Sequence, residues 1–225
     1  MTSSRKREFQ SDVLAGIRVA IPLALAVFGF GVSFGVVARS AHFGLLAPLV
    51  MSATTFAGSA QFAAVSVVGT GGGVAAAIVA ASLLNSRYLP IGISLAPAIT
   101  GRTPRRLLEA QLVVDESWAV SHLGGGRFSE GRLVGAGLLL YVGWLAGTVV
   151  GLLGARLLGD PNRFGLDVVS PVLFLGLLRG QITNRRAALS AVLGAAIALV
   201  LVPFTSPGVP LIAASVACLL GLVRT

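Results

Sequence analysis

Charged residues are scarce in this chain, and acidic ones most of all. The 225 residues include 17 Lys and Arg but only 8 Asp and Glu, and the four types together make up 11% of the chain. Soluble domains average about 25% charged residues. No polar stretch is long enough to build a soluble domain, so we expect a single membrane-embedded domain over residues 1–225.

Cysteine and histidine are also nearly absent. Cys218 is the single cysteine, which excludes an internal disulfide framework. His42 and His122 have no metal-ligand spacing, and the chain contains no Walker loop, nucleophile elbow or paired-histidine motif. We therefore expect neither an enzyme nor an ATP-driven pump, and no metal or other cofactor.

Apolar residues dominate what is present, at 55% of the chain with a mean hydropathy of +0.90. A helix needs about 20 apolar residues to cross a bilayer. Tracts that suit membrane segments are 19–38, 133–153 and 187–204, with shorter ones at 168–178 and 211–223, and 43–99 holds two to three crossings. The sequence predicts an all-α polytopic integral membrane protein with six to eight membrane segments.

The basic residues predict the orientation. Arginine and lysine are enriched in short cytoplasmic loops, where they also meet anionic lipid headgroups, so the formal charge of +9 indicates a lipid bilayer rather than nucleic acid as the partner. If 43–99 crosses an odd number of times and 113–122 does not cross, only Arg39, Arg156 and Arg163 lie outside. This arrangement places both termini in the cytoplasm.

The first apolar run continues to about Ala38 without the polar region that ends a signal peptide. This favours a retained membrane span over a cleaved signal peptide.

The stretch 56–97 mixes apolar residues with helix breakers. It contains Gln61, a glycine run at 69–73 and the polar cluster Asn85 to Arg87. Irregular backbone at membrane depth is tolerated where protein or a water-filled cavity surrounds it, so we predict interrupted or re-entrant helices that form a transport core. The glycine run forms either a tight turn or an anion site of backbone N–H groups. A broken block near Phe56 and another near Asp167 are compatible with an internal repeat, although no identity is long enough to establish one.

Three sets of polar residues are candidates for contacts with the substrate or a coupling proton. Arg87, beside Asn85, either binds a carboxylate, pairs with Asp115 or Glu116 across the bundle, or lies at a membrane boundary. Gln61 bonds either the substrate or a neighbouring helix. Asp115 and Glu116 either bind a proton or an ammonium group, or form an interfacial pair. Adjacent helical side chains diverge by about 100°, so we expect at most one of these two acids to face a site.

Four segments resemble the AzlC family, the large subunits of bacterial branched-chain amino acid exporters. They are FAGSAQF (56–62), NSRYLPIGISLAP (85–97), VVDESWAV (113–120) and LDVVSPVLFLGLL (166–178), in the family's order. The resemblance implies a cytoplasmic (inner) membrane permease that exports valine, leucine and isoleucine without ATP. It also implies a small membrane subunit of the AzlD type as partner.

These considerations predict a secondary transporter that works by alternating access and is coupled to protons. The predicted substrate-binding residues are Phe56, Gln61, Phe62, Asn85, Arg87 and Phe174, and the predicted proton-coupling residues are Asp115 and Glu116. The alternative is a channel or a structural membrane subunit for another small solute.

Overall fold

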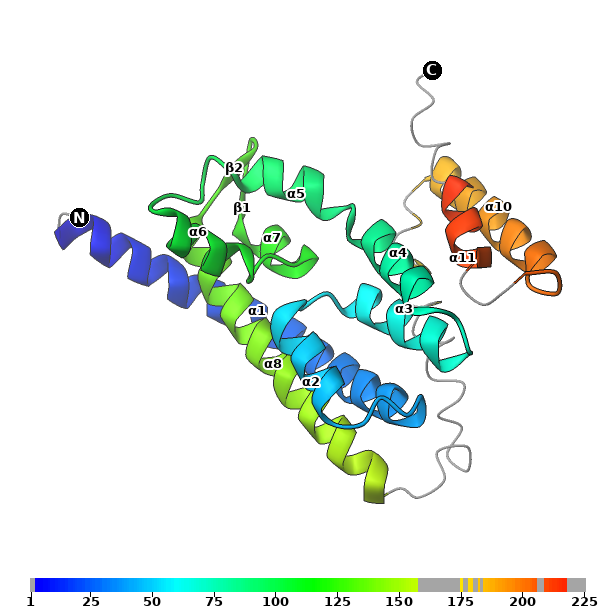
Figure 1. The fold of residues 1–225 in the computed structure, drawn as a ribbon. Helices are drawn as coiled ribbons and strands as arrows, with labels where there is room; N and C mark the ends of the chain where they lie inside the picture. The colour runs from blue at the N-terminus through cyan, green and yellow to red at the C-terminus, as the bar shows by residue number, and fades with distance from the viewer. Residues whose placement is uncertain are drawn as a thin grey trace.

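A computed structural model describes residues 3–157, 175, 178, 179, 182, 184–205 and 209–217. The helices are α1 (Ser3–Ser40), α2 (Leu46–Thr54), α3 (Gly58–Gly69), α4 (Val74–Asn85), α5 (Tyr88–Leu95), α6 (Thr103–Ala110), α7 (Asp115–Ser121), α8 (Glu130–Leu157), α10 (Arg185–Leu201) and α11 (Val209–Ala214), and the strands are β1 (His122–Gly124) and β2 (Arg127–Phe128). The regular secondary structure of the described part is therefore helical apart from one small hairpin (Figure 1). The predicted all-α class holds for this part except at β1 and β2.

Two long helices form the axis of the molecule. α1 has 38 residues and α8 has 28, and both are long and apolar enough to cross a membrane. They lie side by side over most of their length (Figure 1). The predicted spans at 19–38 and 133–153 are both confirmed as helices.

Glycines allow α1 and α8 to pack backbone against backbone. A methyl group added at Gly135, Gly147 or Gly151 would overlap a carbonyl oxygen of α1, those of Val13, Phe28 and Val32 respectively. Small residues at such positions are the usual means of close approach between membrane helices. Gly135, Gly137, Gly143 and Gly147 are the small residues of the tract 133–153 that permit such close approach, and all four face backbone of another segment.

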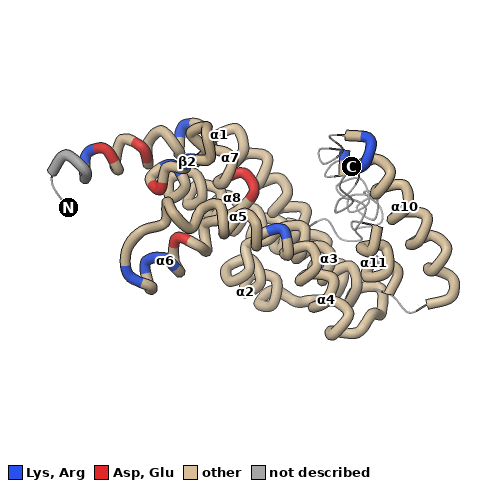
Figure 2. The backbone as a smooth tube through the Cα atoms, turned by 90° about the horizontal axis from the view of Figure 1, so that it is seen from above, with Lys and Arg blue, Asp and Glu red and all other residues tan. Residues whose placement is uncertain are grey.

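The order of these contacts shows that α1 and α8 run in the same direction. Residues 13, 28 and 32 meet residues 135, 147 and 151, so both numberings increase together. Residues 41–129, which connect α1 to α8, must therefore bring the chain back to the end of the molecule where α1 begins. This end carries the N-terminus, α6 and the hairpin, and many of the charged residues gather there (Figure 2).

The tract between the two long helices is broken into short helices, as predicted. α2 and α3 are separated by an irregular turn, and α4 and α5 form a pair bent by 42°. In the described part of the chain, two helices qualify as membrane spans by length and composition, or three if the bent pair is one span. The count of six to eight membrane segments stays a prediction, and the predicted segment 168–178 lies mostly outside the described residues.

At three places the structure either decides between alternatives that the sequence left open or differs from what the sequence indicates. The glycine run forms the turn between α3 and α4, with Gly71 at a positive φ of 89°, which decides between the two interpretations in favour of a turn. Residues 101–111, whose polar composition by itself indicates a loop, include α6, because Pro104 near the helix start and leucines on one side favour an amphipathic helix. The unexpected hairpin exists because Gly124 to Gly126 all adopt the positive φ that a tight turn requires.

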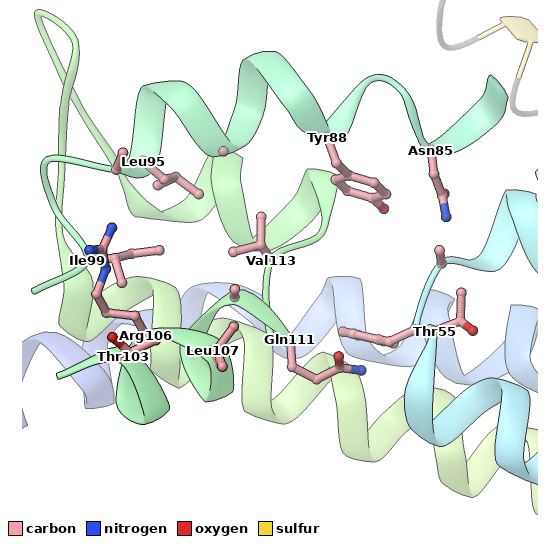
Figure 3. Close-up of a pocket in the computed structure, with 15 residues that line it drawn as sticks. Thr55, Asn85, Tyr88, Leu95, Ile99, Thr103, Arg106, Leu107, Gln111 and Val113 are labelled. Atoms are coloured by element: carbon pink, nitrogen blue, oxygen red, sulfur yellow. The ribbon is translucent and has the colours of Figure 1, made fainter. Parts of the chain in front are cut away.

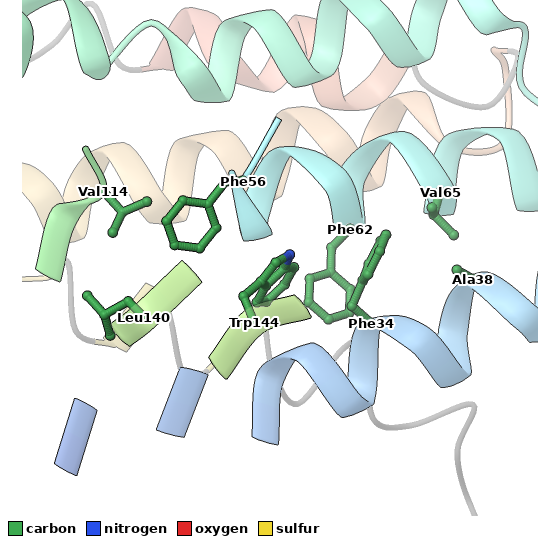
Figure 4. Packing of buried hydrophobic residues seen from close by; sticks show 8 residues of the cluster. All are labelled: Phe34, Ala38, Phe56, Phe62, Val65, Val114, Leu140 and Trp144. Atoms are coloured by element: carbon green, nitrogen blue, oxygen red, sulfur yellow. The ribbon is translucent and has the colours of Figure 1, made fainter. Parts of the chain in front are cut away.

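Aromatic side chains fill the core between α1, α3 and α8. Phe34 stacks on Trp144 with ring centroids 5.6 Å apart, and its edge contacts Phe62 at 5.5 Å (Figure 4). Phe56 and Leu140 continue this cluster toward Val114 at the start of α7. The core therefore ends beside the two acids that open α7.

Candidate functional site

A cavity of about 350 Å³ lies beside this aromatic core, and we call it the ion-pair cavity. Its volume falls within the range of about 300–1,000 Å³ that small-molecule sites occupy. The lining is mostly apolar and includes Phe30, Phe56, Phe62, Leu140 and Trp144, together with the charged residues Arg87, Asp115 and Glu116. Residues far apart in sequence thus meet in one apolar chamber that contains charges of both signs.

Arg87 and Asp115 form an ion pair across this cavity. Nη2 of Arg87 lies 3.1 Å from Oδ2 of Asp115 and donates a hydrogen bond of 3.0 Å to Oγ of Ser59. The guanidinium also lies over the ring of Tyr88, 5.3 Å from its centroid. Nε of Arg87 is buried and has no hydrogen-bond partner in the described part of the chain. Of the alternatives for Arg87, the structure shows the pairing with Asp115 and leaves the buried Nε donor unused.

Asp115 and Glu116 both line the ion-pair cavity, so the expectation that at most one would face a site is wrong. The divergence of about 100° applies to side chains within a helix. Here the helix begins at Asp115, directly after the extended residue Val114. Side chains in the first turn project past the helix end, and both carboxylates therefore reach the same space.

A second cavity of about 500 Å³ lies between α5 and α6, and we call it the α5–α6 cavity. Asn85 lines this cavity and not the one that holds Arg87 (Figure 3). Its buried Oδ1 has no hydrogen-bond partner among the described residues. Arg106 and Ile99 lie at the opposite end of the cavity from Asn85 (Figure 3).

Gln61 is separated from both cavities by its own hydrogen bonds. Its side chain is 1% exposed. Oε1 accepts from the backbone N–H of Ala57 at 3.2 Å, and Nε2 donates to Oγ of Ser52 at 3.2 Å. The structure thus shows the helix-bonding alternative for Gln61, while Phe56 and Phe62 line the ion-pair cavity. Phe174 lies outside the described residues.

The break between α2 and α3 is stabilised by side chains that the sequence analysis did not single out. Nε2 of Gln111 donates to the carbonyl oxygens of Ala53 and Thr54 at 3.3 and 3.0 Å. The hydroxyl of Tyr141 donates to the same Ala53 oxygen at 2.8 Å. These bonds satisfy carbonyls that the interrupted helix leaves free. A phenol in the middle of the apolar run 133–153 was the one available signal.

No three His, Cys, Asp or Glu side chains converge in a possible metal site within the described ranges. The arrangement instead offers a cation, two carboxylates and aromatic walls. These groups complement a small zwitterion that carries an apolar side chain.

Comparison with known proteins agrees with this chemistry. Residues 22–158 match the AzlC protein family. The branched-chain amino acid transport protein AzlC of Bacillus subtilis (strain 168) is 26% identical over 193 residues, which cover 82% of this chain and 75% of that protein. No solved structure matches the chain.

Two further relatives are described only as uncharacterised membrane proteins. The one from Archaeoglobus fulgidus is 30% identical over 204 residues, 90% of each chain. The one from Helicobacter pylori (strain J99) is 24% identical over 197 residues, which cover 84% of this chain and 86% of that protein. Together with the apolar helices, these matches show that the chain is a membrane protein of the AzlC family.

Proposed function

We propose that this protein is a secondary transporter that exports valine, leucine and isoleucine across the cytoplasmic membrane. The observation that carries the proposal is the Arg87–Asp115 ion pair, with Glu116 beside it, in a cavity walled by aromatic and aliphatic side chains. The similarity to a branched-chain amino acid transport protein supports the substrate class.

The ion pair suits a site that alternates between an empty and a loaded state. A charge of one sign left alone in an apolar cavity would be costly. In the empty site Arg87 and Asp115 neutralise each other at 3.1 Å. A bound amino acid would bring its own carboxylate to Arg87 and its ammonium group to Asp115, so the local charge stays balanced. Phe56, Phe62 and Trp144 would then enclose the branched side chain.

Glu116 is the better candidate for proton coupling. Asp115 already has a cationic partner, whereas Glu116 has no ion pair with any described residue although it lines the same cavity. A carboxyl group that lacks a cationic partner in an apolar cavity is the one whose charge is most easily lost to protonation. Asn85 and Gln61 do not line the ion-pair cavity in this proposal. Asn85 lines the α5–α6 cavity, and Gln61 is buried among its own hydrogen-bond partners.

The proposed setting in the cell follows from charge and family. The end that carries the N-terminus and α6 faces the cytoplasm, because it is rich in arginine. A small membrane subunit of the AzlD type completes the transporter, and the C-terminus is also cytoplasmic.

The test is counterflow of labelled leucine in proteoliposomes that contain this chain with its small subunit. We expect saturable exchange in the wild type and its loss in Arg87→Ala and Asp115→Asn. Arg102→Ala is the matched control, since Arg102 is exposed and lines neither cavity. Linear flux that does not saturate would identify a channel, and no flux from folded protein with its subunit would leave a structural role.

The proton assignment has its own test. Glu116→Gln should exchange leucine but no longer concentrate it in response to a pH gradient, because the neutral amide cannot carry a proton across. Retention of gradient-driven accumulation in this variant would contradict the assignment to Glu116. The same experiment on Asp115→Asn then examines the other acid.

A further inference from the structure

The two cavities meet at a shared wall. Phe56 and Tyr88 are the two residues that line both the α5–α6 cavity and the ion-pair cavity. Each cavity has its own polar groups, so neither is an extension of the other. The wall includes two aromatic side chains, Phe56 from the break between α2 and α3 and Tyr88 from the start of α5.

We propose that the α5–α6 cavity is a second amino acid binding site, and that Phe56 and Tyr88 form the barrier between it and the ion-pair cavity. This inference rests on the proposed transport function and adds a position on the substrate's path. An amino acid would bind first between α5 and α6 and then pass the aromatic barrier to reach Arg87.

The α5–α6 cavity offers, at each of its two ends, a contact for one charged group of a zwitterionic amino acid. The side chain of Arg106 forms no ion pair or hydrogen bond with any described residue, so at this end the guanidinium is free for a carboxylate. At the other end, beside Tyr88, the buried, unpartnered Oδ1 of Asn85 is an acceptor for an ammonium group. Because both charged groups of an amino acid are on one carbon, the amino acid would contact Arg106 first and Asn85 afterwards, as it moves toward the barrier. Leu95, Ile99 and Leu107 also line the cavity, and this apolar lining suits an aliphatic side chain (Figure 3).

The barrier residues are held in a way that links them to substrate binding. Phe56 has a positive φ of 42°, a conformation that is strained for a residue with a bulky side chain. Edge-to-face packing on Tyr141, with centroids 5.1 Å apart, keeps its ring in place. Tyr88 lies under the Arg87 guanidinium. A carboxylate that draws Arg87 away from Asp115 would therefore also change the contact that holds Tyr88.

Two adjacent leucines of α6 provide a matched pair for the test. Leu107 lines the α5–α6 cavity, whereas Leu108 does not, and both are well exposed at 67% and 73%. In a Cys218→Ser background, Leu107→Cys and Leu108→Cys would each be treated with an anionic methanethiosulfonate reagent in proteoliposomes that contain the small subunit. The rate of labelling and leucine counterflow would be measured on the same vesicles.

We expect leucine to slow labelling at Leu107→Cys and not at Leu108→Cys, and labelling to block counterflow in the first variant alone. Arg106→Gln should raise the leucine concentration needed for half-protection about tenfold, with Arg102→Gln unchanged. Tyr88→Ala should increase exchange of phenylalanine relative to leucine, because a smaller barrier admits a larger side chain.

The outcomes separate this inference from the proposed function. Normal counterflow with equal labelling, protection and block at the two cysteines would overturn the second site and leave the transporter standing. An unchanged phenylalanine-to-leucine ratio in folded Tyr88→Ala would overturn the barrier. Absence of leucine counterflow in the folded wild type with its small subunit would overturn the proposed function and this inference together.

Discussion

Ser52 connects three side chains in the interior between α2, α3 and α8. It is fully buried, and its Oγ accepts hydrogen bonds from Nε2 of Gln61 and Nε1 of Trp144 at 3.2 and 3.1 Å. Thr148 lies 3.0 Å away and donates its own proton to the carbonyl of Trp144. Ser52 must therefore donate to Thr148. The Ser52 hydroxyl thus uses its one donor and both of its acceptor positions.

Ser52→Ala should destabilise the fold more than its small loss of volume suggests. The amide of Gln61 and the indole of Trp144 would each lose their acceptor, and a buried unsatisfied group costs about 1–3 kcal/mol. We expect the thermal unfolding temperature in detergent to fall by several degrees. Ser33→Ala is the control, since Ser33 bonds only a carbonyl of its own helix. Equal melting of the two variants would contradict the structural role of this network.

Glu109 is a buried acid on α6, outside the two long spans. Arg105 donates to its Oε1 at 2.7 Å and to Oε1 of Glu130 at 2.7 Å. Burial raises the pKa of the Glu109 carboxyl above its ordinary value of 4.5, and the contact with Arg105 opposes this shift without cancelling it. Because the folded pKa is the higher one, the carboxyl's contribution to stability is present below the unfolded pKa and is lost as pH rises through the folded pKa.

The expected signature is a pH-dependent gap between wild type and Glu109→Gln. The unfolding temperature of the variant, relative to wild type, should rise from about pH 4 to pH 7, since the amide never acquires the buried charge. Glu8→Gln, at an exposed position of α1, should show no such trend. A constant difference between the two unfolding temperatures would contradict this expectation. A variant whose unfolding temperature falls relative to wild type over this range would show that the Arg105 contact outweighs burial.

At the level of elements, the contact between α1 and α8 depends on glycine. Gly151 packs against the backbone of Val32, where even one methyl group would overlap a carbonyl oxygen. Gly154, one turn later on α8, has nothing within 4 Å of the space that a methyl would occupy. These two glycines lie three residues apart on one helix but differ in packing.

Gly151→Ala should therefore lower stability, by about 1–3 kcal/mol if the helices shift to relieve the overlap. Gly154→Ala should be neutral or stabilising by up to about 1 kcal/mol, because alanine is the better helix former. Thermal unfolding of the two variants in detergent measures the difference. If Gly151→Ala unfolds at or above the temperature of Gly154→Ala, the close parallel packing is refuted.

The parallel direction of α1 and α8 has a consequence for the whole molecule. Ser40 at the end of α1 and Arg102 before α6 must lie on opposite sides of the membrane if α1 crosses it and the intervening chain returns. In a Cys218→Ser background, a membrane-impermeant thiol reagent added to intact cells should label Ser40→Cys and not Arg102→Cys. Disruption of the membrane should then expose Arg102→Cys to the reagent. Labelling of both sites in intact cells would reject this topology.

The sequence by itself determined the class of protein, the long helices and the places where helices break. Hydropathy and run length are local properties, and they correctly predicted spans at 19–38 and 133–153 and a broken tract between them. The four small residues Gly135, Gly137, Gly143 and Gly147 within one apolar run likewise indicate close helix contact, and the structure places backbone of another segment against each of them. The motifs also indicated the AzlC family.

Tertiary structure alone decided which polar side chains meet. The sequence is compatible with several roles for Arg87, and the pairing of Arg87 with Asp115 depends on α7 packing beside the start of α5. It placed Asn85 with Arg87, yet the two residues line different cavities. It also excluded one of Asp115 and Glu116 from the site, because helical periodicity was applied at a position where the helix only begins. Periodicity describes a helix interior, whereas these contacts arise at helix ends and breaks, where direction is set by neighbouring elements.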